Sequence, residues 1–196
     1  MPAILPIGKI LCQTVDDTGT VVGVNDFDRP YWDQHWRHAR HHGTAPNPHL
    51  VREAAGLTPG TALDAGCGRG AEAGWLAARG WAVTAVDISA EALAHAAANT
   101  VAWVRADLTT WTPSTRFDLV TTHYAHPAMP QLAFYERIAG WVAPGGTLLV
   151  VGHARGHHVA EASATAADIT ALLDGWEIVT AGDHGHDVVV RARRTA

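Results

Sequence analysis

The sequence contains few of the residues that mark secreted, membrane-spanning or nucleic-acid-binding proteins. Its 196 residues include two cysteines, Cys12 and Cys67, whose unrelated contexts predict reduced thiols and a cytoplasmic location. No apolar run reaches the roughly 18–20 residues that span a bilayer, and residues 1–10 lack the pattern of a signal peptide. Lys9 is the only lysine, the net charge is −5, and the arginines do not cluster. We therefore expect no membrane partner and no nucleic-acid partner, since phosphates attract a basic surface.

Apolar residues are plentiful, at 47% of the chain, and the length suits one domain with a substantial core. From residue 61 onward, short apolar segments alternate with segments of helical pattern. The predicted strands are 61–65, 82–87, 101–105, 117–122 and 147–152, and the predicted helices between them are 71–79, 90–98 and 130–142. This alternation is typical of a doubly wound α/β fold with a parallel sheet and right-handed crossovers.

The two ends of the chain have a different pattern. Residues 9–24 alternate weakly around a turn and predict a β-hairpin. Asp28 and Pro30 predict the start of a helix over 29–41, and Asn47-Pro48 predicts a second helix that ends near Gly56. We therefore expect residues 1–44 to form a hairpin and lid helix, a cap that does not fold independently, on a main domain of residues 45–196.

At the C-terminal end, a helix over 165–174 leads into strands 176–180 and 188–193. Only a short Gly/Asp/His turn joins these two strands, so they must pair antiparallel. The sheet is thus expected to be parallel except at its last strand.

The most informative segment is Ala62-Leu-Asp-Ala-Gly-Cys-Gly-Arg-Gly, which joins a predicted strand to a predicted helix. Gly66, Gly68 and Gly70 permit a sharp turn and a close approach of the backbone to a ligand. The free N–H groups of the following helix point to the same place. This segment predicts a nucleotide-type binding site, and Asp64 offers a carboxylate to a cationic ligand.

Two further carboxylates end the next two predicted strands. Asp87 is placed to accept both ribose hydroxyls of a nucleoside, and the simpler alternative is that it caps a helix, for which Ser89 is better suited. Asp107 is placed to accept a hydrogen bond from an adenine amino group, and otherwise it is an ordinary loop residue.

A dinucleotide site is the main alternative, because Gly66, Gly68 and Ala71 match the pattern G-x-G-x-x-A. Asp64 argues against it, since a carboxylate would repel a pyrophosphate. The tight turn at Pro144-Gly-Gly and the antiparallel final hairpin also argue against it. An NAD-dependent oxidoreductase is therefore a remote alternative.

Taken in order, five motifs resemble those of the class I S-adenosylmethionine-dependent methyltransferases. They are Asp64-Ala-Gly-Cys-Gly-Arg-Gly, Val86-Asp87, Ala106-Asp107, Phe117-Asp-Leu-Val and Pro144-Gly-Gly-Thr-Leu-Leu. The resemblance covers about residues 45–193, and Trp75-Leu-Ala-Ala-Arg-Gly-Trp-Ala-Val is loosely similar to small bacterial tellurite-resistance and thiopurine methyltransferases. It implies a Rossmann-like, seven-stranded sheet with an antiparallel last strand.

The resemblance also implies the cofactor, S-adenosylmethionine, and the product, S-adenosylhomocysteine. By this resemblance Asp64, Gly66, Gly68 and Gly70 hold the methionine part of the cofactor. The nucleoside is assigned to Asp87 and Ile88 for the ribose and to Asp107 and Leu108 for the adenine. Tyr31 and Trp32 are expected to cover the cofactor, because an N-terminal helix often does so in this family; the alternative is that they only pack.

The family's acceptor site lies above the carboxyl end of the fourth strand, which here is the segment 121–127. It lacks the Asn/Asp-Pro-Pro-Tyr pattern of enzymes that methylate the exocyclic amines of bases. The candidate catalytic residues are His123, Tyr124 and His153, and the candidate substrate-binding residues are His126, Arg155 and His157. The alternative is that some of these side chains only pack or cap the loop.

Thirteen histidines make chance clusters common, and we expect no metal site. His153 and His157 have the i,i+4 spacing of helical metal ligands, but Gly152 and Gly156 argue against a helix there. The histidines at positions 35, 38, 41 and 42 are interpreted as a solvated helix face.

The predicted function is methyl transfer to a small-molecule acceptor, either a thiol or chalcogen, a hydroxyl, or a carboxylate, by a monomer or homodimer. The alternative from another class is a sensor or partner subunit that binds S-adenosylmethionine without transferring methyl. The polar His/Tyr cluster at the acceptor position favours the enzyme.

Overall fold

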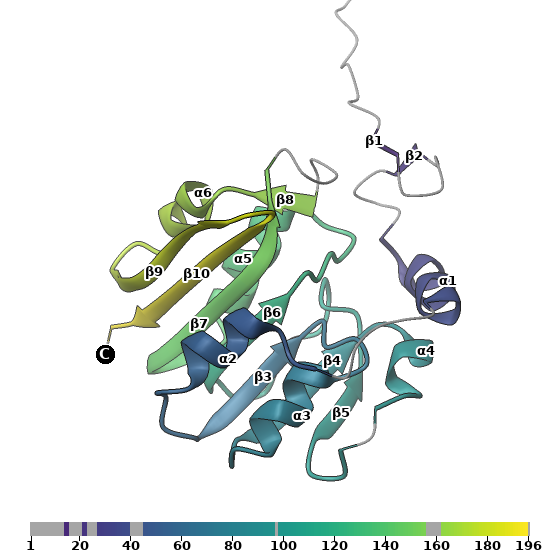
Figure 1. The fold of residues 1–196 in the computed structure, drawn as a ribbon, viewed down its shortest axis with the longest axis horizontal. Coiled ribbons are helices and arrows are strands. Elements are labelled where there is room, and N and C mark those ends of the chain that lie inside the picture. Colours follow the sequence, from purple (N-terminus) through teal and green to yellow (C-terminus); the bar gives the residue numbers. More distant parts are fainter. Residues whose placement is uncertain are drawn as a thin grey trace, which may run out of the picture.

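The computed structural model describes residues 27–39, 45–96, 98–155 and 162–195 with their side chains, and the backbone of Thr14–Val15 and Val21–Val22. An eight-stranded sheet lies between two layers of helices (Figure 1). Seven strands follow the order β5-β4-β3-β6-β7-β10-β9, and β8 pairs with β7 beside this path. The strands are β3 (Thr61–Ala65), β4 (Ala82–Asp87), β5 (Ala102–Arg105), β6 (Phe117–His123), β7 (Val142–Ala154), β8 (Ser163–Ala164), β9 (Trp176–His184) and β10 (Asp187–Arg194).

The pairing confirms the predicted sheet. The strands from β3 to β8 pair parallel, whereas β10 runs antiparallel to both of its neighbours, β7 and β9. The carboxyl ends of the parallel strands therefore meet at one edge of the sheet. The chain passes from β3 to β4 on one side and later to β6 on the other, so the gap between the ends of β3 and β6 is the topological switch point, where ligands bind in this fold class.

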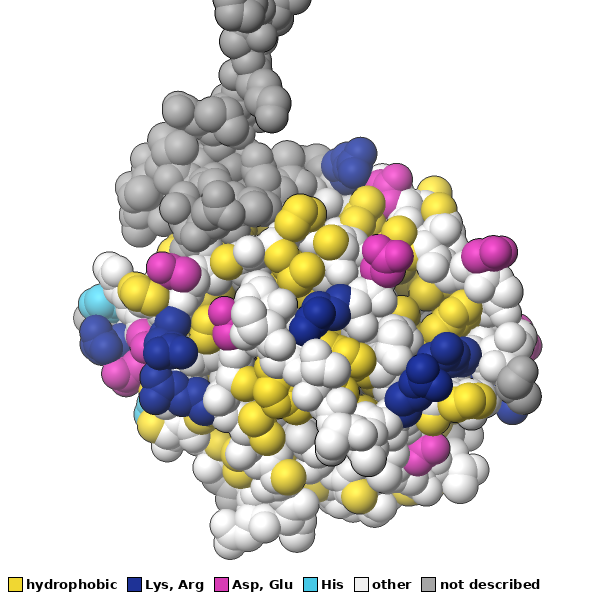
Figure 2. Space-filling view, turned by 180° about the vertical axis from the view of Figure 1, so that it is seen from behind, with side chains coloured by type: hydrophobic (Ala, Val, Ile, Leu, Met, Phe, Trp, Pro, Cys, Tyr) yellow, Lys and Arg dark blue, Asp and Glu magenta, His cyan; other side chains and the backbone are white. Residues whose placement is uncertain are grey.

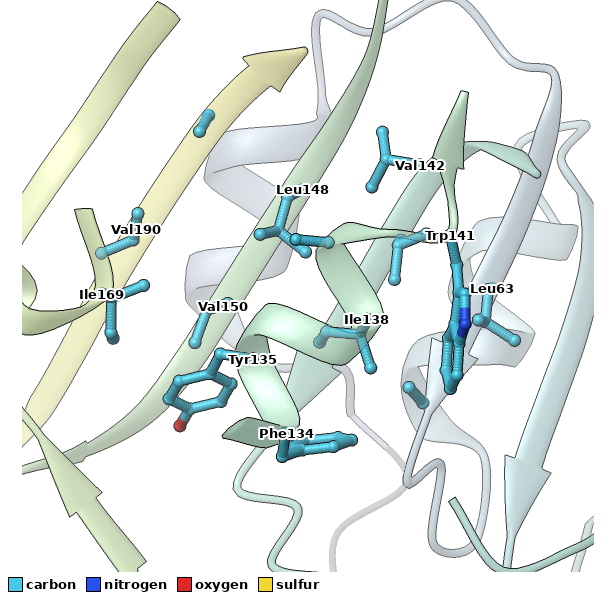
Figure 3. Close-up of a cluster of buried hydrophobic side chains, with 14 of the residues drawn as sticks. Leu63, Phe134, Tyr135, Ile138, Trp141, Val142, Leu148, Val150, Ile169 and Val190 are labelled. Carbon is cyan, nitrogen blue, oxygen red and sulfur yellow. The ribbon is translucent and has the colours of Figure 1, made fainter. Parts of the chain in front are cut away.

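Helices cover both faces of the sheet (Figure 1). They are α1 (Arg29–His38), α2 (Pro48–Ala54), α3 (Ala71–Ala77), α4 (Ala90–Leu93), α5 (Gln131–Ala139) and α6 (Ala166–Ala171). On one face, Leu50 of α2 and Leu76 of α3 are fully buried, with α2 packed on β7 and α3 packed on β3 and β4. On the other, Phe134 and Ile138 of α5 belong to the same buried cluster as Leu148 of β7 (Figure 3). Burial of apolar side chains on both faces holds the strand ends at fixed positions.

Local signals explain where most of the elements begin. Asp28 accepts a hydrogen bond from the N–H of Tyr31 and caps α1, and Ser89 caps α4 in the same way through Ala92. Thr165 and Asp168 form a capping box at the start of α6. β1 (Thr14–Val15) and β2 (Val21–Val22) pair antiparallel within the predicted hairpin.

Several elements differ from the sequence prediction. α1 ends at His38 instead of residue 41, and α4 ends at Leu93 instead of residue 98. The four-residue α4 buries only Ala92, and the alanines that follow offer too little apolar surface to stabilise a longer helix. β7 begins at Val142 rather than at residue 147, so the predicted turn at residues 144–146 lies within the strand, beside a register shift against β6. β8 was not predicted, because two residues carry no periodic pattern.

Candidate cofactor and acceptor site

The glycine loop after β3 has a backbone that only glycine adopts readily. The φ angles of Gly66, Gly68 and Gly70 are 80°, 52° and 81°, all in the left-handed region. A Cβ atom on Gly68 would lie 2.8 Å from the ring of Trp36, and one on Gly66 or Gly70 would collide with Ala125 or Trp103. The loop is therefore fixed in a shape that presents backbone, without side chains, at the switch point.

Asp87 at the end of β4 holds this loop in place. Its Oδ2 atom accepts from the N–H of Gly68 at 2.8 Å, and its Oδ1 atom accepts from the N–H of Ser89 at 2.8 Å. The residue is 7% exposed, and burial raises the pKa of Asp87, which the bonds from Ser89 and Gly68 only partly offset. Because a carboxylate oxygen has more than one lone pair, Asp87 can still accept from two hydroxyl groups of a ligand. Ile88 follows it, partly buried.

Asp64 lies almost fully buried beside the loop and carries an unsatisfied oxygen. The residue is 1% exposed, and its Oδ2 atom has no hydrogen-bond partner among the described residues. Its Oδ1 atom is 3.9 Å from Nδ1 of His123, which also has no hydrogen-bond partner among the residues described. An orphaned buried carboxylate oxygen is costly, and an ammonium group of a ligand would satisfy it.

Glu72 adds a second carboxyl group to this position. It lies in the first turn of α3, and its Oε1 atom accepts from the backbone N–H of Asn47 at 3.0 Å. Burial, and then the charge of Asp64, raise the pKa of Glu72, while His123 opposes the shift. The charges of Asp64, Glu72 and His123 therefore influence one another in this part of the protein, and two carboxyl groups against one imidazole suit a cationic ligand.

The loop after β5 carries the predicted adenine contacts. Oδ1 of Asp107 accepts from the backbone N–H and the hydroxyl of Thr109, at 2.8 and 2.7 Å. Leu108 is buried, and its carbonyl accepts from Nε of Arg137 at 2.9 Å. Asp107 thus has a structural role in its own loop, and its Oδ2 atom has no bond within the described part of the chain.

His123 ends β6 and points inward. Its side chain is 5% exposed, and Nε2 lies 3.3 Å from the hydroxyl of Thr121. The structure thus places the side chain of this predicted catalytic residue beside the buried carboxylate of Asp64.

Tyr124 and His153 belong to a series of partly stacked rings that extends toward α1. The ring centroids are 4.8 Å apart for Tyr124 and His153, 5.2 Å for His153 and His126, and 6.5 Å for His126 and Trp32. Nε1 of Trp32 also donates to the carbonyl of His126 at 3.1 Å. His153 lies within β7, not in the loop after it as the sequence indicated. The rings form one wall, which we call the ring wall, beside the carboxyl ends of β6 and β7.

Helix α1 lies next to α4 and over the glycine loop (Figure 1). Asp33 accepts from the hydroxyl of Ser89 at 2.6 Å, and Arg37 pairs with Glu91 at 2.9 Å. The helix residue against the loop is Trp36, at Gly68. Of the two predicted lid residues, Trp32 lies in the ring wall and Tyr31 contacts Trp32 and Phe27.

Of the two remaining predicted substrate residues, only Arg155 belongs to the described part of the chain. Arg155 is exposed and pairs with Asp168 at 3.0 Å, and His157 lies outside the described residues, as do Cys12, His41 and His42. Among the residues that the structure describes, no group of three or more His, Cys, Asp or Glu side chains could hold a metal ion. In the same part of the chain, no helix has both the length and the apolar character that crossing a membrane requires.

Sequence reasoning missed Trp36, Asn47, Glu72 and Asp187 as site residues. Glu72 had one local signal, because an acid in the first turn after a glycine loop lies near the ligand position. Asn47 and Asp187 had none. Nδ2 of Asn47, just before α2, donates to the Tyr124 oxygen at 3.4 Å, and Asp187 of β10 pairs with His153, so both come from elements far away in the sequence. Their contacts exist only in the folded chain.

Comparisons with known proteins identify the domain. Residues 62–146 match a family model described as a methyltransferase domain. An uncharacterized methyltransferase of Mycobacterium tuberculosis is 42% identical over 95 residues, which are 45% of this chain and 48% of that protein. The trans-aconitate 2-methyltransferase of Streptomyces avermitilis is 33% identical over 141 residues, which are 61% of this chain and 49% of that protein. The chain thus spans about half the length of the curated relatives it matches.

Solved structures show the same fold. The N-methyltransferase NodS of Bradyrhizobium japonicum, in complex with S-adenosylhomocysteine, aligns with a TM-score of 0.69 at 18% identity over 87% of this chain and 100% of that one. Magnesium protoporphyrin IX methyltransferase of Synechocystis, with S-adenosylmethionine bound, aligns with a TM-score of 0.65 at 19% identity. The alignment covers 90% of this chain and 99% of that one. TehB of Haemophilus influenzae aligns with a TM-score of 0.62 at 15% identity over 85% of this chain and 67% of that one. Residues 62–146 thus match a methyltransferase domain family, and the sheet built around them has the fold of the class I S-adenosylmethionine-dependent methyltransferases.

Proposed function

We propose that this chain binds S-adenosylmethionine at the glycine loop and transfers its methyl group to a small molecule. One observation carries the proposal: the buried, unsatisfied Oδ2 atom of Asp64 lies beside a loop with three left-handed glycines. A methionine ammonium group would satisfy that oxygen, and the bare loop would accommodate the rest of the methionine part. The cofactor supplies an electrophilic methyl group on a sulfonium sulfur.

The roles of the chain's residues follow from their positions. Asp87 and Ile88 would bind the ribose, and Asp107 and Leu108 would border the adenine. Asp64, Glu72 and His123 would hold the ammonium group. Two of the solved neighbours named above are described with S-adenosylmethionine or S-adenosylhomocysteine bound, which supports a site for this cofactor.

Methyl transfer is an in-line displacement, so the protein contributes mainly by positioning the two reactants. Such positioning is worth up to about 7–11 kcal/mol in well-oriented reactions. Here the glycine loop and Asp87 fix the cofactor side, while the ring wall of Tyr124, His153, His126 and Trp32 fixes the acceptor side. Helix α1 covers the loop and would limit the access of water.

A small acceptor suits the surface of the molecule better than a nucleic acid does. Basic and acidic side chains are interspersed on the face seen in Figure 2, and the chain is acidic overall. The acceptor classes that we propose are a thiol or chalcogen, a hydroxyl or a carboxylate. The carboxylate class also follows from the name of the relative that is a trans-aconitate methyltransferase. We further propose that the protein works in the cytoplasm, as a monomer or homodimer.

The test combines binding and turnover. Calorimetry with S-adenosylhomocysteine and with NAD should show binding of the first only; binding of NAD alone would refute the proposed cofactor. Release of S-adenosylhomocysteine is then measured over small thiols, chalcogen oxyanions, phenols and carboxylates, trans-aconitate included. Tight cofactor binding without turnover on any class would support a non-catalytic binding protein instead.

A further inference from the structure

Arg69 joins the glycine loop to the end of helix α1. Its Nη2 atom donates to the carbonyl oxygen of Trp36 at 3.2 Å and to that of Ala39, the C-cap of the helix, at 3.3 Å. The last carbonyls of a helix lack partners within the helix, and the negative end of the helix dipole favours a cation. The guanidinium group of Arg69 thus caps α1 from within the proposed cofactor loop.

The side chain of Trp36 contacts the same loop at two successive residues. The guanidinium carbon of Arg69 lies 5.6 Å from the centroid of the indole ring, within the range of a cation–π contact. The far edge of that ring lies 2.8 Å from the place that a Cβ atom on Gly68 would occupy. The end of α1 is therefore held on the loop by both hydrogen bonds and ring contacts.

A closed circuit of hydrogen bonds runs from α1 through the proposed ribose carboxylate and back. Asp33 of α1 accepts from the hydroxyl of Ser89 at 2.6 Å, and the N–H of Ser89 donates to Asp87 at 2.8 Å. The other oxygen of Asp87 accepts from the N–H of Gly68 at 2.8 Å, and the next residue, Arg69, returns to α1. A ligand on Asp87 thus acts on a network that reaches α1 from two sides.

The attachment through Arg69 is suited to reversible opening. No residue of α1 is fully buried, so little apolar surface is exposed when the helix lifts. The Nε atom of Arg69 is buried and has no hydrogen-bond partner among the described residues. Opening gives up two carbonyl bonds and the ring contact, while water then satisfies the Nε donor. Because these effects oppose one another, a bound ligand can decide the position of α1.

We propose that Arg69 is a positioning residue that couples closure of α1 to occupancy of the cofactor site. This inference rests on the proposed S-adenosylmethionine site. A ligand on Asp87 and the glycine loop steadies the loop in the shape from which Arg69 holds α1. The coupling is reciprocal, so the closed helix in turn slows the departure of the product, S-adenosylhomocysteine.

The first experiment measures the rate at which S-adenosylhomocysteine dissociates, by surface plasmon resonance. Arg69→Gln removes the cation, and we expect dissociation about tenfold faster than in the parent protein. Arg69→Lys keeps a cationic donor but lacks the planar group that faces Trp36, so its rate should lie between the two. Arg79→Gln is the matched control, because the exposed Arg79 makes the same two kinds of contact with Trp75, and it should leave the rate unchanged.

Hydrogen exchange distinguishes this coupling from a merely structural role. In the parent protein, saturating S-adenosylhomocysteine should slow exchange within 29–38 by about tenfold. In Arg69→Gln at saturation, the ligand should slow it by less than about threefold, while exchange in the paired strands β7 and β10 stays as in the parent. A merely structural role would raise exchange within 29–38 equally with and without ligand, and that result would overturn the coupling.

The outcomes also separate this inference from the proposed function. If the parent protein binds S-adenosylhomocysteine and Arg69→Gln releases it at the same rate, the coupling is wrong and the proposed cofactor site stands. A parent protein that does not bind S-adenosylhomocysteine would refute the proposed function, and the coupling with it. Equally fast release from Arg79→Gln would overturn the assignment of the effect to Arg69.

Discussion

At the scale of single residues, Asp87 combines two tasks in one carboxylate. It ties the glycine loop to β4 and is placed to accept the ribose hydroxyls. Asp87→Ala should weaken the binding of S-adenosylhomocysteine by about 1.5–3 kcal/mol, the value of hydrogen bonds to a charged group. Calorimetry measures this loss, with the exposed Asp174→Ala as control. Unchanged affinity in Asp87→Ala would remove Asp87 from the cofactor site.

His123 leads to a different expectation once its surroundings are known. The sequence made it the leading candidate for a base at the acceptor, but its Nδ1 atom faces Asp64 in the buried cluster. We predict that His123→Asn weakens S-adenosylhomocysteine binding about fivefold, roughly 1 kcal/mol. Turnover at saturating cofactor should change less. A large fall in kcat with full cofactor affinity would return His123 to the acceptor side.

The residues that sequence reasoning found share a local signal. Gly66, Gly68 and Gly70 stand at the end of a strand and before a helix, so their spacing alone indicates a ligand loop. Asp87 ends the next strand, so its position at a strand end also indicates a ligand contact. Asp187 ends no such motif, because it comes to lie opposite His153 through the pairing of β10 with β7, which no short stretch of sequence encodes.

At the scale of secondary-structure elements, α1 is held by side-chain contacts rather than by a buried face. None of its residues is fully buried, and Asp33 and Arg37 join it to the start of α4. Burial raises the pKa of Asp33, but hydrogen bonds from Ser89, Glu91 and Ala90 outweigh that effect and lower it. Because the pKa of Asp33 is lowered in the folded state, its bonds contribute fully to stability above the ordinary pKa range of a carboxyl group. This stabilisation is lost as the pH falls through the lowered pKa of Asp33.

Asp33→Ala should therefore loosen α1 without unfolding the sheet. We expect hydrogen exchange within 29–38 to rise at neutral pH, and S-adenosylhomocysteine to bind more weakly because Trp36 no longer covers Gly68 steadily. Gln34→Ala changes an exposed residue of the same helix and serves as the control. Equal exchange in Asp33→Ala and in the parent protein would show that these contacts do not hold α1.

Element boundaries were predictable wherever a cap or a strong apolar pattern stood at the end. Asp28 and Ser89 mark helix starts that the structure confirms. The end of α4 and the length of β7 were not predictable, because both depend on tertiary packing: α4 finds little surface to bury, and β7 gains residues by pairing with β6 and β10.

At the scale of the whole molecule, cofactor binding and protonation should be coupled. Burial raises the pKa of Asp87 and of Glu72, so both acids hold their protons to a higher pH than usual in the ligand-free fold. The proposed ribose hydroxyls and ammonium group favour the charged carboxylates and would lower these pKa values. Binding should therefore release protons, and the affinity should fall as the pH drops into the raised pKa range.

Thermal unfolding with and without S-adenosylhomocysteine tests this coupling. A ligand at a hundredfold excess over Kd stabilises by about 2.7 kcal/mol, which is roughly 5–11 °C for a domain of this size. We expect the ligand-induced rise in Tm to be largest at pH 7 and to shrink toward pH 5 at a fixed ligand concentration. Glu72→Gln cannot release a proton, so it should reduce this pH dependence. A rise in Tm that is the same at both pH values, in the parent protein, would mean that Asp87 and Glu72 bind the cofactor without a change in protonation.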